Sequence, residues 1–70
     1  MKATEFVRRA RRYSRQTGLE FEYDPRTGKG SHGRIFVGDY LTAIKSSNKN
    51  IGPGLLRKML KDLHIDSKDF

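Results

Sequence analysis

The chain has 70 residues, enough for one domain with a single modest core, and residues 1–70 are expected to form that domain. It has no cysteine, which excludes disulfides and thiolate-held metals. Fifteen Lys and Arg against eight Asp and Glu leave a net charge of +7, which favours a polyanionic partner, and nucleic acid is the commonest polyanion in a cytoplasm. No apolar stretch approaches the roughly 20 residues of a membrane span and no signal-peptide core is present, so a soluble, cytoplasmic protein without membrane contact is predicted.

Residues 4–15 have the spacing of an amphipathic helix, with Thr4 as the expected N-cap and Gly18 as the residue that ends it. One apolar stripe is formed by Ala3, Phe6, Val7, Ala10 and Tyr13. The opposite face carries Arg8, Arg9, Arg11, Arg12 and Arg15. Five arginines without a lysine favour phosphate or an acidic partner, because the planar guanidinium makes paired hydrogen bonds that lysine cannot make.

Three strands are predicted after this helix. Residues 19–24 alternate between apolar side chains (Leu19, Phe21, Tyr23) and acidic ones. The proline and glycines of residues 25–33 predict a loop, and a second strand is expected to begin at Arg34. The Gly38-Asp39 pair suits a type II′ turn, so residues 40–45 should return antiparallel. That turn puts Ile35, Val37, Tyr40, Thr42 and Ile44 on one face and Phe36, Leu41, Ala43, Arg34 and His32 on the other. Both faces carry apolar residues, so the pattern leaves either as the core, and the first is taken as buried because its apolar set is larger.

Residues 51–65 predict a closing helix with Pro53 at its first helical position and Gly52 ahead of it. Its apolar stripe is Leu55, Leu56, Met59, Leu60 and Leu63, and its wet side is Arg57, Lys58, Lys61 and Asp62. Residues 66–70 are expected to fray. The fold class that follows is α+β, a two-layer α-β-β-β-α arrangement of two helices and a three-stranded antiparallel sheet.

The stretch TGKGSHGRIF at residues 27–36 is the most informative motif. It does not match the Walker phosphate-binding loop, whose pattern is Gly-x-x-x-x-Gly-Lys-Ser/Thr. Here the lysine lies between two glycines, and the second glycine that the pattern needs upstream is missing. A metal site is not expected, since His32 and His64 are the only histidines and no carboxylate cluster joins them. A hydrolase triad is equally poor, because Ser31 adjoins His32 where neighbouring side chains point to opposite faces. No cofactor is predicted.

What remains is a lone histidine in a setting suited to phosphate. Gly28, Gly30 and Gly33 let backbone amides approach a ligand, Lys29 and Arg34 bring positive charge, and Ser31 adds a donor. Because a histidine titrates near neutrality, His32 can take a proton from a ribose 2′-OH or give one to a leaving oxygen. Those are the proton transfers of RNA cleavage by internal attack, which needs no metal. On spacing alone, an ordinary loop histidine is an equal alternative, whereas His64 is expected merely to favour a helix C-terminus.

Two motifs together resemble the HicA family of toxins: GKGSHG at the start of the second strand, and IGPGLLRKMLKDLHI as the closing helix. The resemblance covers residues 3 to 65. It implies a fold similar to the double-stranded RNA-binding domain, His32 as the catalytic histidine with Gly30 and Ser31 as its motif neighbours, ribosome-independent cleavage of mRNA, and a HicB-like antitoxin that covers the active site. Many relatives carry a second histidine or a polar cluster after the third strand, where this chain has Lys45, Ser46 and Ser47.

The sequence thus predicts the toxin of a type II toxin–antitoxin system, a metal-independent mRNA endoribonuclease with His32 as acid and base. Gly28, Lys29, Gly30, Ser31 and Arg34 are the predicted substrate-binding residues. The alternative is a non-catalytic module that holds structured RNA by its shape, as the double-stranded RNA-binding domain does. A third possibility is a basic domain that binds an acidic protein.

Overall fold

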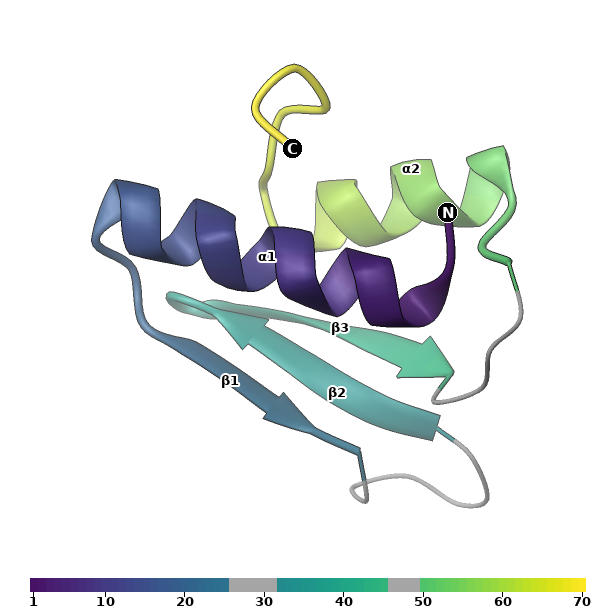
Figure 1. Cartoon of the computed structure of the whole chain (residues 1–70), viewed down its shortest axis with the longest axis horizontal. Coiled ribbons are helices and arrows are strands. Elements are labelled where there is room, and N and C mark those ends of the chain that lie inside the picture. Colours follow the sequence, from purple (N-terminus) through teal and green to yellow (C-terminus); the bar gives the residue numbers. More distant parts are fainter. Residues whose placement is uncertain (26–31, 46–49) are drawn as a thin grey trace.

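A computed structural model of the chain describes residues 1–25, 32–45 and 50–70, and for residues 32 and 45 it describes the backbone alone. The elements in chain order are α1 (Ala3–Thr17), β1 (Phe21–Asp24), β2 (His32–Val37), β3 (Tyr40–Lys45) and α2 (Pro53–Asp62). Figure 1 shows the two helices lying over one face of the sheet, while the other face is left open. The predicted α+β class and its two-layer α-β-β-β-α order are confirmed.

Helix α1 is longer than predicted at both ends. The N–H of Phe6 bonds to the carbonyl of Lys2 at 3.0 Å, so Lys2 and not Thr4 is the N-cap, and its side chain makes no capping hydrogen bond. Gly18 ends the helix as predicted, in a left-handed conformation with φ 73° that glycine adopts without steric penalty.

The three strands form an antiparallel sheet in the order β1-β2-β3. Val37 pairs with Tyr40 across the predicted Gly38-Asp39 turn, and Gly38 has φ 61°, which a type II′ turn requires at its first central position. β2 begins at His32, two residues earlier than predicted, and β1 begins at Phe21, two residues later. Leu19 therefore precedes the strand and is 43% exposed, so its predicted burial is wrong.

The predicted inner face of the sheet is confirmed for its middle residues. Its fully buried members are Ile35, Val37, Thr42 and Ile44. Tyr40 is the exception: it is 45% exposed, and its ring stacks on that of His64 with 3.7 Å between centroids. The core that the sheet and helices enclose also contains Phe6, Ala10, Met59, Leu60 and Leu63. α1 packs over β1 and β2, and α2 packs over β3.

Helix α2 has Gly52 as its N-cap and Pro53 at its first position, as predicted, but it ends at Asp62, three residues earlier than predicted. Leu55 was expected in the buried stripe and is 46% exposed. Asp62 was expected on the wet side, but its carboxylate accepts a hydrogen bond of 3.1 Å from the buried Thr42 hydroxyl. The last turn of α2 is thus tied to β3.

Both ends of the chain pack against the fold. The expectation that residues 66–70 fray is wrong, because the Phe70 ring lies 4.8 Å from the Phe6 ring and the Lys68 N–H bonds to the Asp66 carboxylate at 3.0 Å. The N–H of Ile51 bonds to the Met1 carbonyl at 2.6 Å, next to an isolated bridge between residues 2 and 50. Among the described residues, no helix is both long and apolar enough to span a membrane.

Candidate functional site

The predicted substrate-binding loop lies mostly outside the described residues, and this holds for Gly28, Lys29, Gly30 and Ser31. The two predicted site residues that follow belong to β2. His32 is its first residue, and its backbone pairs with that of Lys45 in β3. Arg34, two residues further along, is exposed. The motif therefore enters the middle strand of the sheet at its N-terminal end.

Gly33 has a role that the sequence did not reveal. It was expected to let a ligand approach, but it is buried inside β2, and a Cβ at this position would lie 2.7 Å from the Asp24 carbonyl oxygen and 2.8 Å from the Pro25 Cα. Real Cβ atoms essentially never come that close to backbone, so only glycine suits this position. Gly33 thereby holds the end of β1 against the start of β2, next to His32.

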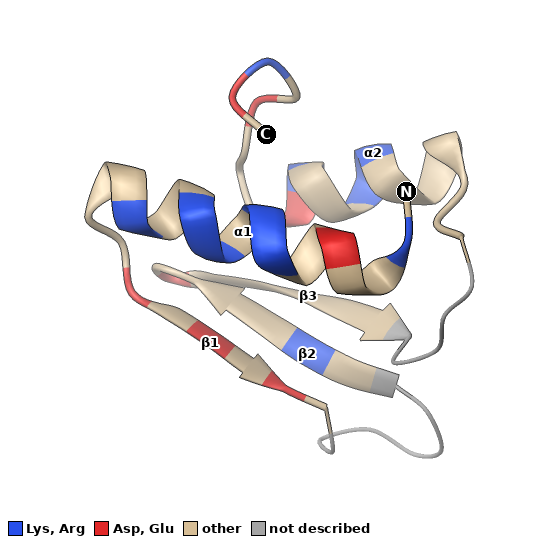
Figure 2. Ribbon diagram, viewed as in Figure 1, with Lys and Arg blue, Asp and Glu red and all other residues tan. Residues whose placement is uncertain are grey.

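The open face of the sheet carries charge of both signs. β1 supplies Glu22 and Asp24, and the register places Asp24 opposite Arg34 and Glu22 opposite Phe36. Figure 2 shows the acidic residues along β1 and the basic residues concentrated along α1. A hollow at the turn end of this face is lined by Glu20, Glu22, Phe21, Phe36 and Gly38. Because like charges repel, a phosphate backbone is disfavoured at the β1 side and at this hollow.

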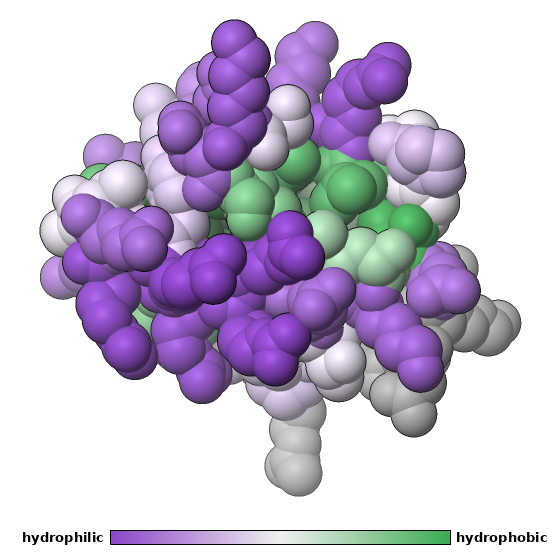
Figure 3. Space-filling view, turned by 45° about the horizontal axis from the view of Figure 1, so that its top comes forward, coloured by the Kyte–Doolittle hydropathy of each residue, from purple (hydrophilic) through white to green (hydrophobic). Residues whose placement is uncertain are grey.

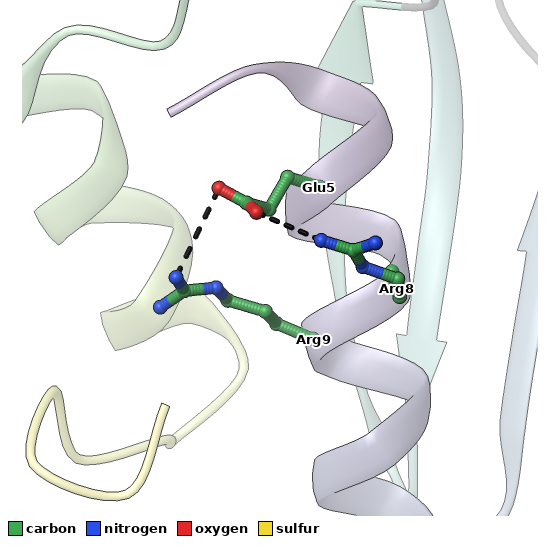
Figure 4. Close-up of polar contacts among 3 residues, drawn as sticks. All are labelled: Glu5, Arg8 and Arg9. Carbon is green, nitrogen blue, oxygen red and sulfur yellow. Dashed lines mark hydrogen bonds and ion pairs between the residues drawn. The ribbon is translucent and has the colours of Figure 1, made fainter.

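The outer surface of α1 carries a row of three exposed arginines, Arg8, Arg12 and Arg15, which we call the arginine ridge. These positions share the side of the helix opposite its buried stripe. Arg8 is paired with Glu5 at 2.9 Å, as Figure 4 shows, and this exposed pair is weak. Arg12 and Arg15 have no ion pair among the residues that the structure describes. The ridge is therefore a solvated cationic surface available to an anion.

The remaining two arginines of α1 are engaged at its flanks. Arg9 lies 3.9 Å from the Glu5 carboxylate and extends from α1 toward α2 in Figure 4. The Arg11 guanidinium lies 5.4 Å from the centre of the Phe21 ring, within range of a cation–π contact. The single arginine face predicted from periodicity is thus divided into the ridge and two flanking side chains.

The second histidine is remote from the first. His64 stacks on Tyr40 at the start of β3, whereas His32 pairs with Lys45 at the end of that strand. Five residue steps of about 3.4 Å separate Tyr40 from Lys45, so the two ends of β3 lie about 17 Å apart. That separation excludes His64 as a second proton-transfer group beside His32 in the same molecule.

Two further observations bear on the chemistry of the site. Within residues 1–25, 32–45 and 50–70, no group of three His, Cys, Asp or Glu side chains could hold a metal ion. Comparisons of the chain with protein-family models, with curated proteins and with solved structures found no match. The likeness to a known family is therefore carried by the sequence motifs alone.

Proposed function

We propose that this chain is a HicA-like toxin of a type II toxin–antitoxin pair, acting in the cytoplasm as an endoribonuclease that cuts mRNA without a metal. The observation that carries the proposal is the Gly-Ser-His motif of residues 30–32, which leads into the middle strand of an α-β-β-β-α fold. The arginine ridge of α1 supports it, because exposed guanidinium groups, of which those of Arg12 and Arg15 have no ion pair among the described residues, bind a phosphate backbone.

His32 is the proposed acid and base. Its neutral imidazole takes the proton from a ribose 2′-OH, and the 2′-oxygen attacks the adjacent phosphorus. The bond from phosphorus to the 5′-oxygen breaks, and the imidazolium gives its proton to that oxygen. The products are a 2′,3′-cyclic phosphate and a free 5′-OH. With His64 at the far end of β3, the second group of such a reaction has to come from another residue, or His32 serves in both steps.

The remaining predicted site residues bind substrate in this proposal. Lys29 and Arg34 attract the phosphate, and the backbone of Gly28, Gly30 and Ser31 orients it through N–H donors. The arginine ridge collects the polynucleotide at longer range, because its positive charge raises the local concentration of RNA. The proposed partner is a HicB-like antitoxin that covers the site and blocks access to it.

The decisive experiment compares His32→Ala with His64→Ala on a labelled mRNA fragment in the presence of EDTA. Acid and base catalysis contributes about a hundred- to ten-thousand-fold, so His32→Ala should stop cleavage, while wild type and His64→Ala continue to cut. Circular dichroism should show the same fold for all three chains. Undiminished cleavage by His32→Ala, or a requirement for added divalent metal in the wild type, would refute the mechanism.

The second candidate is an RNA-binding module without catalysis, and the arginine ridge favours it because that surface binds RNA whether or not His32 reacts. The same experiment separates the two functions. A catalyst shortens the RNA and leaves cyclic phosphate ends, whereas a binding module retards intact RNA in a native gel.

A further inference from the structure

A groove runs along α2 on the helical side of the molecule, away from His32 and the open sheet face. We call it the α2 groove; it is lined by Pro53, Leu56, Arg57, Leu60, Lys61, Ile65 and Ser67. Figure 3 shows apolar side chains between the helices, bordered by hydrophilic ones. From this surface we propose that the α2 groove is a docking site for an acidic, amphipathic helix of a protein partner.

The floor of the groove is apolar. Leu56 is half-buried, and Leu60 and Ile65, which also line the groove, are buried members of the core. Phe70 is not among the residues that line the groove, and its ring packs on Phe6 of α1. A partner that brings its own apolar side chains would remove this surface from water, which favours binding by about 25 cal/mol per Å².

The rim of the groove is cationic. Arg57 and Lys61 are both exposed and stand one helical turn apart. Neither has a carboxylate at ion-pair distance among the described residues, whereas Lys58, on another side of α2, is paired with Asp62 at 3.0 Å. Two unpaired cations beside an apolar floor are complementary to acidic side chains beside apolar ones.

The dimensions and chemistry of the groove favour a protein helix over RNA. From Pro53 to Lys61 it is about 12 Å long at 1.5 Å per residue, which matches two turns of a partner helix. Nucleic-acid bases bind by stacking on aromatic rings, and the groove lining contains none. The inference stands independently of RNA cleavage, because it uses no residue of the proposed catalytic site.

The test uses the full chain labelled with ¹⁵N and a capped 16-residue helical peptide, with leucine along one face and glutamate along the other. NMR shifts should map to α2 and to Ile65. The double variant Arg57→Glu/Lys61→Glu should weaken binding at least about tenfold, because it places like charges opposite the peptide. The matched control Arg12→Glu/Arg15→Glu removes the same charge from the arginine ridge and should change affinity by less than about twofold.

The apolar half of the site is tested separately. Leu56→Ala should also weaken binding, and a peptide of the same composition with its leucines scattered around the helix should bind much more weakly. The proposal is overturned if both double variants lose affinity equally, because net charge alone then explains binding. It is also overturned if the scattered peptide binds as well, or if the groove variants impair RNA binding and leave peptide binding intact.

Discussion

Thr42 of β3 and Asp62 of α2 are joined by a hydrogen bond of 3.1 Å that the threonine hydroxyl donates to the carboxylate. Lys58 donates a second bond, of 3.0 Å, to the same carboxylate oxygen. The Lys58 bond and, less strongly, the Thr42 bond lower the pKa of Asp62 below its usual 3.8, against the opposing effect of desolvation. This contact fixes the C-terminal turn of α2 on the edge strand of the sheet.

The first prediction concerns acid stability. Because the pKa of Asp62 is lowered in the folded chain, its ionised carboxylate stabilises the fold. This contribution to stability is complete above pH 3.8 and is lost as the pH falls through the folded-state pKa. Asp62→Asn should therefore flatten the fall of Tm below about pH 4, measured by circular dichroism. Asp39→Asn is the matched control, since it removes a carboxylate from the exposed hairpin turn. If Tm fell in parallel with pH for wild type and Asp62→Asn, the stabilising role of the ionised Asp62 carboxylate would be contradicted.

The second prediction concerns the close approach at Gly33. Gly33→Ala places a methyl group against the backbone of Asp24 and Pro25, so it should destabilise the fold by about 1–3 kcal/mol. Gly54→Ala is the control: a Cβ there meets nothing within 4 Å, and it should stabilise the chain by about 0.4–1 kcal/mol. Urea unfolding of both variants measures these differences. If the Gly33→Ala and Gly54→Ala variants were equally stable, β1 and β2 would be free to move apart beside His32 and make room for the methyl group.

The third prediction concerns the stacked pair of Tyr40 and His64. His64→Ala removes the ring contact and should lower stability by about 0.5–1.5 kcal/mol. His64→Gly removes the same ring but also relieves the positive φ of 57°, so its loss should be smaller by about 1 kcal/mol. Thermal unfolding compares the two. A larger loss for glycine than for alanine would show that the backbone at this position carries no strain.

The fourth prediction concerns the arginine ridge. Arg12→Gln/Arg15→Gln should weaken RNA binding and reduce the slope of log Kd against log salt by about 1.4, since each phosphate contact to a single strand contributes about 0.7. Fluorescence anisotropy over a salt series measures this slope. Lys68→Gln removes an exposed charge from the C-terminal segment and serves as the control. An unchanged slope in the double variant would place the RNA on another surface.

The element order could be predicted because periodicity and turn chemistry agree along the chain. Alternation about the Gly38-Asp39 turn divided the hairpin residues between two faces, since pairing Val37 with Tyr40 determines every other pair. It did not decide which face is buried, because both carry apolar residues. The same pattern failed at the ends of elements. Leu19, Tyr40 and Leu55 share the buried phase, but each lies near the end of its segment and is more than 40% exposed. The pattern along one segment does not show how far the element that packs against it extends.

The surroundings of the candidate site were only partly predictable from the sequence. The exposure of Arg34 followed from strand alternation. The role of Gly33 could not follow, because it depends on the register between β1 and β2 across residues 26–31. The division of the α1 arginines was hidden for the same reason: Phe21, which contacts Arg11, belongs to a different element.

The bond between the Met1 carbonyl and the Ile51 N–H has a consequence for how the helical layer opens. The main chain that leads into the first helix also secures the main chain that leads into the last one, although about fifty residues of sequence lie between them. Loss of this hydrogen bond releases both stretches of main chain together. The two helices should therefore exchange their amide hydrogens as one cooperative unit. A change at the N-terminus that breaks this bond should then alter amide exchange in both α1 and α2.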